Sequence, residues 1–311
     1  MRVTATANRI EKKSNEESDA SGTASFGIQL KCPRCGGDVP DQVCIGCDLH
    51  IRTIQGVVHA LPPERVAYHA RFVEVYERMC CEQFSGRPSD EYYLGLPYGI
   101  ACSRSCPEWS WRARSFDYLL RRVLNPAVPR NARILDIGAG NCWLSYRLAL
   151  AGYNPCAIDL MTNDQHGLGA AERYRNYVPE FFPRIRAEMA NLPFRDGQFH
   201  AAIFNASLHH TENVEVALRE ALRCCMPNGI IIISDTPIYR SAEIGEHTAI
   251  QPLPPFLTGE AIKSLESRLM IRWAVHTPQL GLKRTLRRMN AWLWNHPRPP
   301  QFPIYVARKL P

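Results

Sequence analysis

The chain has 311 residues, of which 45% are hydrophobic, and this length suffices for one full α/β domain with a small appendage. It contains no stretch of about eighteen consecutive apolar residues, so the usual pattern of a transmembrane helix is excluded. A formal net charge of +7 is compatible with nucleic-acid binding but does not by itself indicate it.

Residues 1–25 are polar and contain few large apolar side chains, which predicts a disordered tail. This stretch also lacks the apolar core of a signal peptide. The chain contains twelve cysteines, and without an export signal they favour a reducing, cytoplasmic environment.

Two Cys-x-x-Cys pairs lie within residues 26–60, where we predict a small zinc ribbon. Cys32 and Cys35 form the first pair, Cys44 and Cys47 form the second, and eight residues separate the two. Glycines adjoin both pairs, so the four thiolates can converge on one tetrahedral zinc ion. Four free thiols or two redox-active pairs are the alternatives. We favour a closed, structural zinc site because the pattern includes neither histidine nor carboxylate.

Residues 61–129 are predicted to form a helical connector. Apolar residues recur on one face over residues 62–84, which predicts one helix. A second helix is predicted over residues 109–124, ended by Asn125-Pro126. The irregular segment between them contains Cys102 and Cys106, to which the sequence assigns no role.

A glycine-rich turn follows a short buried strand near the middle of the chain. The strand carries Asp136, the turn is Gly138-Ala139-Gly140-Asn141, and a helix begins near Trp143. A second strand ends at Asp159-Leu160, where a carboxylate can bind both hydroxyls of a ribose. The third glycine of a dinucleotide fingerprint and the lysine of a phosphate loop are absent. The pattern therefore suits a cationic, phosphate-free ligand with a nucleoside end and an amino-acid end.

Three further segments follow in order. Glu188-Met189 comes before Leu192-Pro193-Phe194, and after a turn a strand ends at Asn205 and leads to Leu208-His209-His210. A helix over residues 216–225 is ended by a proline and a glycine ahead of a buried strand over residues 230–235. From about residue 130 to residue 235 the chain resembles the class I S-adenosylmethionine-dependent methyltransferases. The resemblance implies a Rossmann-like seven-stranded sheet within residues 130–311.

The resemblance also implies roles for individual residues. Asp136, Gly138, Gly140 and Asn141 would shape the methionine side of S-adenosylmethionine, and Asp159 with Leu160 would hold its ribose. Glu188, where the family more often has aspartate, and Met189 would meet the adenine, and Asn205 would line the transfer site. His209 is a candidate general base, whereas we favour a structural role for His210 at a helix start.

In this family the segment before the first strand often covers the cofactor, so the connector is a candidate lid. Its candidate wall residues can equally be residues that pack the connector onto the core: Tyr92, Tyr93, Tyr98, Trp109, Trp111 and Arg114. An insertion over residues 237–255 is expected above the ligand-binding edge of the sheet, with Tyr239, Arg240, Glu243 and His247 as possible acceptor contacts or solvated residues.

The remainder of the chain is predicted to complete the sheet. A helix over residues 258–269 leads to a strand over residues 271–275, and the last strand covers residues 301–309. Between these strands, residues 282–294 form a basic amphipathic segment. It can contact nucleic acid, a membrane surface or an acidic substrate, or be a solvated helix.

We therefore expect a cytoplasmic methyltransferase that acts on O or N of a small-molecule metabolite. The alternative is an RNA methyltransferase that grips nucleic acid through the ribbon and the basic segment. A non-catalytic zinc-ribbon adaptor is the third hypothesis. The sequence does not identify the acceptor or the oligomeric state.

Overall fold

The computed structural model describes residues 27–82, 88–99, 108–241, 256–278 and 300–310. The predicted tail, Cys102 and Cys106, Glu243 and His247, and the basic segment 282–294 lie outside the described residues. Within the described residues, no helix has both the length and the apolar character needed to cross a membrane.

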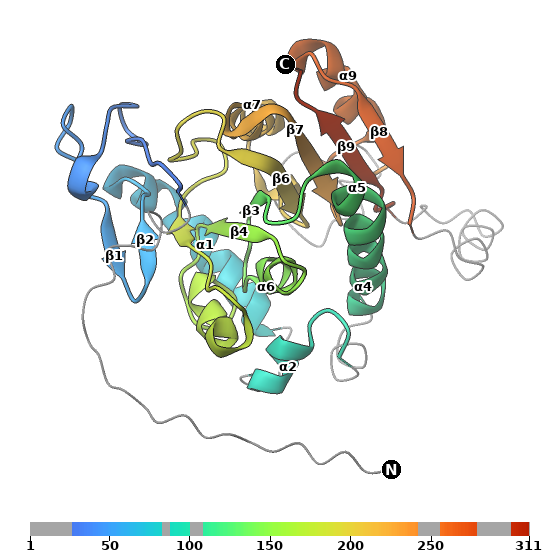
Figure 1. Ribbon diagram of the computed structural model, residues 1–311, viewed down its shortest axis with the longest axis horizontal. Coiled ribbons are helices and arrows are strands. Elements are labelled where there is room, and N and C mark those ends of the chain that lie inside the picture. Colours follow the sequence, from blue (N-terminus) through green and yellow to red (C-terminus); the bar gives the residue numbers. More distant parts are fainter. Residues whose placement is uncertain (1–26, 83–87, 100–107, 242–255, 279–299, 311) are drawn as a thin grey trace.

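One mixed sheet runs through the described part of the molecule, with its strands in the order β1-β2-β5-β4-β3-β6-β7-β9-β8 (Figure 1). Strands β3 to β7 pair in parallel, and β9 is antiparallel to both β7 and β8. Seven neighbouring strands of this sheet form the predicted Rossmann-like class I methyltransferase sheet, in the order β5, β4, β3, β6, β7, β9 and β8. The strand bounds are β1 Arg52–Ile54, β2 Val57–His59, β3 Arg133–Ile137, β4 Asn154–Asp159, β5 Arg184–Arg186, β6 Phe199–Asn205, β7 Cys225–Ser234, β8 Trp273–His276 and β9 Ile304–Arg308.

The other two strands come from the cysteine-rich N-terminal segment. β1 and β2 form an antiparallel hairpin, and β2 pairs in parallel with β5 at Val58 and Ile185. The Ala60 N–H extends this pairing by donating to the Arg186 carbonyl at 3.1 Å. An unpaired edge strand exposes backbone N–H and C=O groups, and pairing with β2 provides hydrogen-bond partners for these groups of β5. The ribbon is consequently continuous with the methyltransferase sheet.

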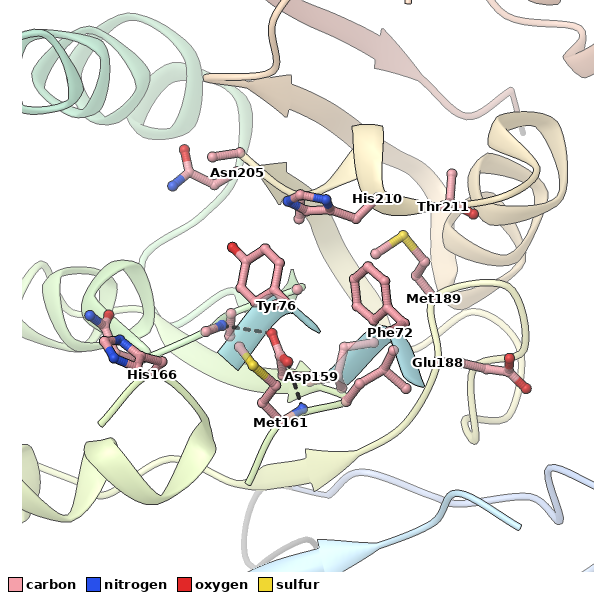
Figure 2. A pocket seen from close by; sticks show the side chains of 18 of the residues that line it. Phe72, Tyr76, Asp159, Met161, His166, Glu188, Met189, Asn205, His210 and Thr211 are labelled. Atoms are coloured by element: carbon pink, nitrogen blue, oxygen red, sulfur yellow. Dashed lines mark hydrogen bonds between the residues drawn. The ribbon is translucent and has the colours of Figure 1, made fainter. Parts of the chain in front are cut away.

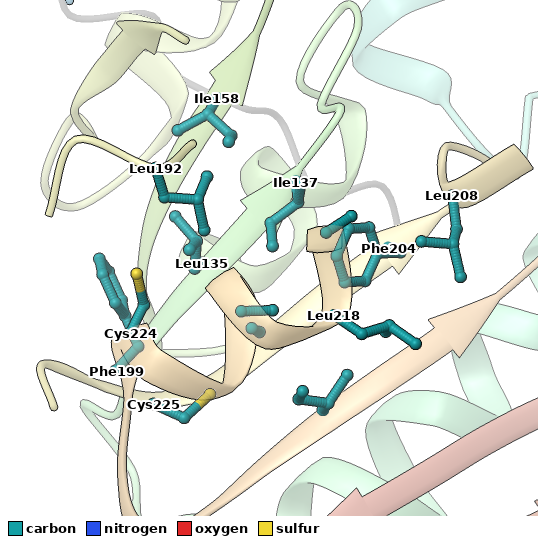
Figure 3. Close-up of a cluster of buried hydrophobic side chains, with 14 of the residues drawn as sticks. Leu135, Ile137, Ile158, Leu192, Phe199, Phe204, Leu208, Leu218, Cys224 and Cys225 are labelled. Atoms are coloured by element: carbon teal, nitrogen blue, oxygen red, sulfur yellow. The ribbon is translucent and has the colours of Figure 1, made fainter. Parts of the chain in front are cut away.

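Helices cover both faces of the sheet because successive strand residues point to opposite sides. Ile134, Ile230 and Ile232 pack toward α6 and the end of the connector. Leu135, Ile231 and Ile233 pack toward α7 and α9, and Figure 3 shows Leu218 of α7 above this second face. The helices in these layers are α4 Glu108–Tyr118, the π-helical η2 Leu119–Leu124, α5 Asn125–Ala127, α6 Trp143–Leu150, α7 Val214–Cys224 and α9 Gly259–Leu269.

The connector begins with the predicted long helix, α1 Pro63–Glu82, and continues through the short α2 Asp90–Gly95. Two guanidinium hydrogen bonds fasten α2 to α6, because Arg147 donates to the carbonyls of Leu94 and Leu96 at 2.8 and 2.5 Å. Asn125-Pro126 does not end the helical run, since α5 continues to Ala127. Proline is tolerated there because a first-turn residue needs no N–H partner.

Candidate active site and metal centre

The four knuckle cysteines converge at one point. Their sulfur atoms all lie within 4.8 Å of one another. Cys32 Sγ is 3.5 Å from Cys47 Sγ, and Cys35 Sγ is 3.4 Å from Cys44 Sγ. A disulfide needs about 2.05 Å, whereas zinc with bonds of about 2.3 Å separates its thiolates by roughly 3.8 Å. The donor set and its spacing therefore fit a tetrahedral zinc. His50, an exposed residue beyond the second pair, is not part of this cluster.

A pocket of about 590 Å³ lies at the carboxyl ends of β3, β4, β5 and β6. This size is within the range of small-molecule sites, and the position is the ligand-binding edge of an open α/β sheet. Among the predicted cofactor residues, those that line the pocket are Gly138, Gly140, Asn141, Asp159, Leu160, Glu188, Met189 and Asn205.

The turn after β3 brings main chain to the pocket wall. Gly138 has a φ of 75°, and a Cβ there would lie 2.4 Å from the Cβ of Ser207. Only glycine allows the turn to approach this neighbouring segment so closely. Asp136 does not line the pocket: it is buried and accepts a 2.7 Å hydrogen bond from Ser145 Oγ. Burial raises the pKa of Asp136 to about 7, although the Ser145 hydroxyl opposes the rise.

Asp159 ends β4 and joins two pocket segments. Its carboxylate accepts backbone N–H bonds from Gly140 and Met161, each at 2.8 Å (Figure 2). Burial raises the pKa of this carboxyl, and the two N–H groups act in the opposite direction. An ionised carboxylate offers about four lone-pair sites, so two acceptor positions remain for a diol.

Glu188, beyond β5, is held by the connector. Arg65 Nε donates to Oε1 at 2.9 Å, and His69 Nε2 lies 2.9 Å from Oε2. Burial alone would raise the pKa of Glu188, but the contacts with His69 and Arg65 lower it. In Figure 2 the Glu188 side chain points away from Asp159. The sequence did not indicate these two partners, which come from α1 more than a hundred positions away.

Helix α1 supplies an aromatic wall opposite the strand ends. Phe72 and Tyr76 are stacked at 5.8 Å between ring centroids, and His210 meets Tyr76 edge to face at 5.1 Å. Figure 2 shows the Phe72 and Tyr76 rings between Asp159 and the segment that follows β6. The helical periodicity of residues 62–84 indicated one buried face but not a ligand cavity beneath it. The pocket-facing residues of α1 were therefore missed.

The two histidines after β6 occupy different positions. His210 lines the pocket, whereas His209 is not among its lining residues. Burial lowers the pKa of His210 to about 4. Burial, together with the neighbouring charges of His210 and Arg112, lowers that of His209 well below its usual range. Both Nδ1 atoms are buried without a hydrogen-bond partner among the described residues.

The other predicted wall residues divide into two groups. Tyr92, Tyr93 and Trp109 line the pocket, as does Arg112, which the sequence did not single out. Tyr98, Trp111, Arg114, Tyr239 and Arg240 are not among the lining residues. Tyr98 instead donates a 2.8 Å hydrogen bond to Asp117, and Trp111 stacks on Phe302. Periodicity could not separate Tyr92, Tyr93 and Trp109 from Tyr98 and Trp111, because all five are aromatic residues on the same connector.

Comparison with known proteins identifies the central part of the chain. Residues 135–233 match the family described as a methyltransferase domain. The chain carries a class I methyltransferase domain. The match covers the glycine turn, Asp159, Glu188 and the histidine segment, which line the sheet side of the pocket.

Similar proteins share parts of this methyltransferase domain. A malonyl-[acyl-carrier protein] O-methyltransferase of Erwinia pyrifoliae is 30% identical over 114 residues, 36% of this chain and 41% of that protein. A ubiquinone/menaquinone biosynthesis C-methyltransferase of Rhizobium rhizogenes is 23% identical over 148 residues, 45% of this chain and 57% of that protein. The chain thus spans about half the length of these curated relatives. The solved YcgJ protein of Bacillus subtilis has a TM-score of 0.48 at 15% identity, covering 64% of this chain and 99% of that one.

Proposed function

We propose that this protein is an S-adenosylmethionine-dependent methyltransferase that methylates O or N of a small-molecule metabolite. The observation that carries the proposal is Asp159: a half-buried carboxylate at the end of β4 that accepts a hydrogen bond from the glycine turn and lines the pocket. When bound, S-adenosylmethionine supplies an electrophilic methyl group on a sulfonium.

The residues of the pocket fit this cofactor from end to end. Gly138, Gly140 and Asn141 would receive the amino-acid end, and Asp159 with Leu160 would hold the ribose. Glu188 and Met189 would bind the adenine. Asp136 supports the site from below, because its buried carboxyl is attached to α6 through Ser145.

The acceptor would lie between the aromatic wall of α1 and the segment after β6. Asn205 and His210 line this part of the pocket together with Tyr76. Burial keeps His210 neutral at pH 7, so its imidazole can accept a hydrogen bond and then a proton from an acceptor group, with a basicity below that of a free histidine. We therefore assign the candidate general base to His210, and His209 becomes a residue that packs behind it.

The acceptor is proposed to be a small molecule because several aromatic side chains line the pocket. The names of the two curated relatives describe an O-methyltransferase and a C-methyltransferase, so the acceptor atom needs a direct test. We propose zinc as the occupant of the Cys32, Cys35, Cys44 and Cys47 cluster, with a structural role.

Titration calorimetry with S-adenosylmethionine tests the proposal, with zinc quantified in the same sample. Binding in the micromolar range would support it and justify an acceptor screen that begins with small molecules and ends with RNA. A folded, zinc-loaded protein that does not bind the cofactor would contradict it and favour the adaptor hypothesis.

A further inference from the structure

We propose that Arg34 and Glu64 are positioning residues for the adenine end of the cofactor site, acting through Arg65 and His69 on Glu188. The inference rests on the proposed function, because it assumes that the pocket binds an adenine nucleoside. The cysteine ribbon would thereby orient the Glu188 carboxylate, whose side-chain hydrogen bonds among the described residues are with Arg65 and His69 of α1.

Two residues of α1, Arg65 and His69, contact the Glu188 carboxylate directly. The Glu188 side chain is only 7% exposed, and Arg65 Nη2 approaches its Oε2 to 2.5 Å. His69 contacts the same oxygen at 2.9 Å. Arg65 Nε also reaches Oε2, at 3.1 Å, so Oε2 has three contacts, whereas Oε1 has only the Arg65 Nε contact and retains lone-pair capacity. Arg65 and His69 therefore determine which carboxylate oxygen is available to an adenine amino group.

An ion pair between Arg34 and Glu64 connects the ribbon to the start of α1. Arg34 lies between Cys32 and Cys35, and its guanidinium donates to both Glu64 oxygens, with Nε at 2.8 Å and Nη2 at 2.7 Å. Such a bidentate ion pair fixes the relative orientation of the two side chains as well as their distance. Glu64 and Arg65 are consecutive in the first turn of α1, so one residue is tied to the ribbon and the next to Glu188.

The ribbon also holds the backbone that follows Glu188. Asn191 donates its side-chain amide to the Pro33 carbonyl, and the Lys31 N–H donates to the Pro193 carbonyl at 3.0 Å. Residues 188–193 and the start of α1 are thus attached to the same short segment, residues 31–34. The described residues that line the pocket begin at Arg65, so the described ribbon residues 27–60 act on it indirectly, through these attachments and through the pairing of β2 with β5. Preorganised side chains bind a ligand more tightly, because less conformational entropy is lost when the ligand associates.

Glu64→Gln provides the first test, because this change leaves the cysteine segment intact. We expect S-adenosylhomocysteine to bind about twofold to fivefold more weakly, the range for an exposed ion pair. Calorimetry should also compare S-inosylhomocysteine, which has an oxygen in place of the adenine amino group. The preference for the adenine ligand should shrink, since Glu188 is then less well oriented. Equal weakening of both ligands would overturn the proposal, as would unchanged affinity.

A charge exchange provides the second test. Arg34→Glu and Glu64→Arg should each weaken S-adenosylhomocysteine about fivefold to tenfold, and the double variant should recover to within about twofold of the unmodified protein. Failure of the double variant to recover at full zinc content would contradict the coupling. Glu74 and Arg78 form an exposed ion pair on the same helix at 2.8 Å. Exchanging their charges is the matched control and should leave affinity unchanged.

These outcomes are distinct from failure of the proposed function. If the unmodified protein binds neither nucleoside, the cofactor assignment itself is wrong. If it binds S-adenosylhomocysteine and the Glu64→Gln variant binds it equally well, only the positioning role is wrong.

Discussion

The imidazole of His210 stands edge-on to the ring of Tyr76, with 5.1 Å between their centroids and 81° between their planes. One ring comes from the segment after β6 and the other from α1, so this contact closes the pocket between the sheet and the connector (Figure 2). It also holds the imidazole beside the site where an acceptor would bind.

Replacing His210 should therefore affect chemistry more than cofactor binding. A positioned general base contributes about 100-fold or more to rate, so we expect His210→Gln to lower kcat by that order. The affinity for S-adenosylmethionine should change less than about threefold. The matched control is His209→Gln, which removes a neighbouring imidazole that does not line the pocket. Steady-state kinetics with an identified acceptor, together with calorimetry, would make the comparison; equal loss in both variants would refute the assignment.

Asp159→Ala should weaken S-adenosylmethionine at least about tenfold. The substitution removes the ribose acceptor and frees the N–H groups of Gly140 and Met161 that the carboxylate holds. Asp117→Ala removes a carboxylate that pairs with Tyr98 outside the pocket, and it should leave affinity unchanged. Calorimetry on both variants is the measurement. Full affinity in Asp159→Ala would show that the ribose lies elsewhere.

Cys47→Ser should release the metal and loosen the ribbon. A thiolate lost from a four-thiolate site leaves zinc with three ligands, which lowers its affinity and the stability of the segment it organises. We expect about one zinc per chain in the unmodified protein and well below half of that in the variant, measured by elemental analysis. Cys80→Ser, which changes a thiol outside the cluster, should keep full metal content. Retention of zinc by Cys47→Ser would contradict the site.

The depressed pKa of His210 should reduce stability in acid. Above pH 6.5 the imidazole is neutral in both states. As the pH falls toward 4, the unfolded chain binds a proton that the buried imidazole resists, so the free energy of unfolding decreases. His210→Gln should lose less stability than the unmodified protein between pH 7 and pH 4.5, by roughly 2–3 kcal/mol. His209 titrates in the same direction, so part of the slope should remain. Urea unfolding at both pH values measures the difference, and identical slopes would argue against burial of His210.

Asp136 should have the opposite pH dependence. Its pKa is raised by burial to about 7, so the stability that its neutral form provides is complete below about pH 4 and is lost as the pH rises through 7. Asp136→Asn retains an acceptor for Ser145 without a charge. The variant should gain roughly 3–4 kcal/mol relative to the unmodified protein between pH 4 and pH 8. A constant difference in unfolding free energy over this range would contradict the raised pKa.

The sequence by itself determined the methyltransferase sheet and the convergence of the four cysteines. Both depend on local signals: buried branched strands, a glycine turn that no other residue type permits, and knuckle spacing that leaves the thiolates few other arrangements. The same signals identified Gly138 and Asp159 as residues that line one pocket, because the carboxyl ends of parallel strands meet at one edge.

Only the tertiary structure decided what lies across the pocket from that edge. Arg65, His69 and Tyr76 belong to a helix whose periodicity indicates a buried face without indicating what that face covers. Glu188 and its partners Arg65 and His69 are far apart in sequence, and no local pattern encodes a contact that exists only once α1 crosses the strand ends. The choice between His209 and His210 follows the same rule, since neighbouring residues differ in orientation and only packing selects which imidazole reaches the cavity.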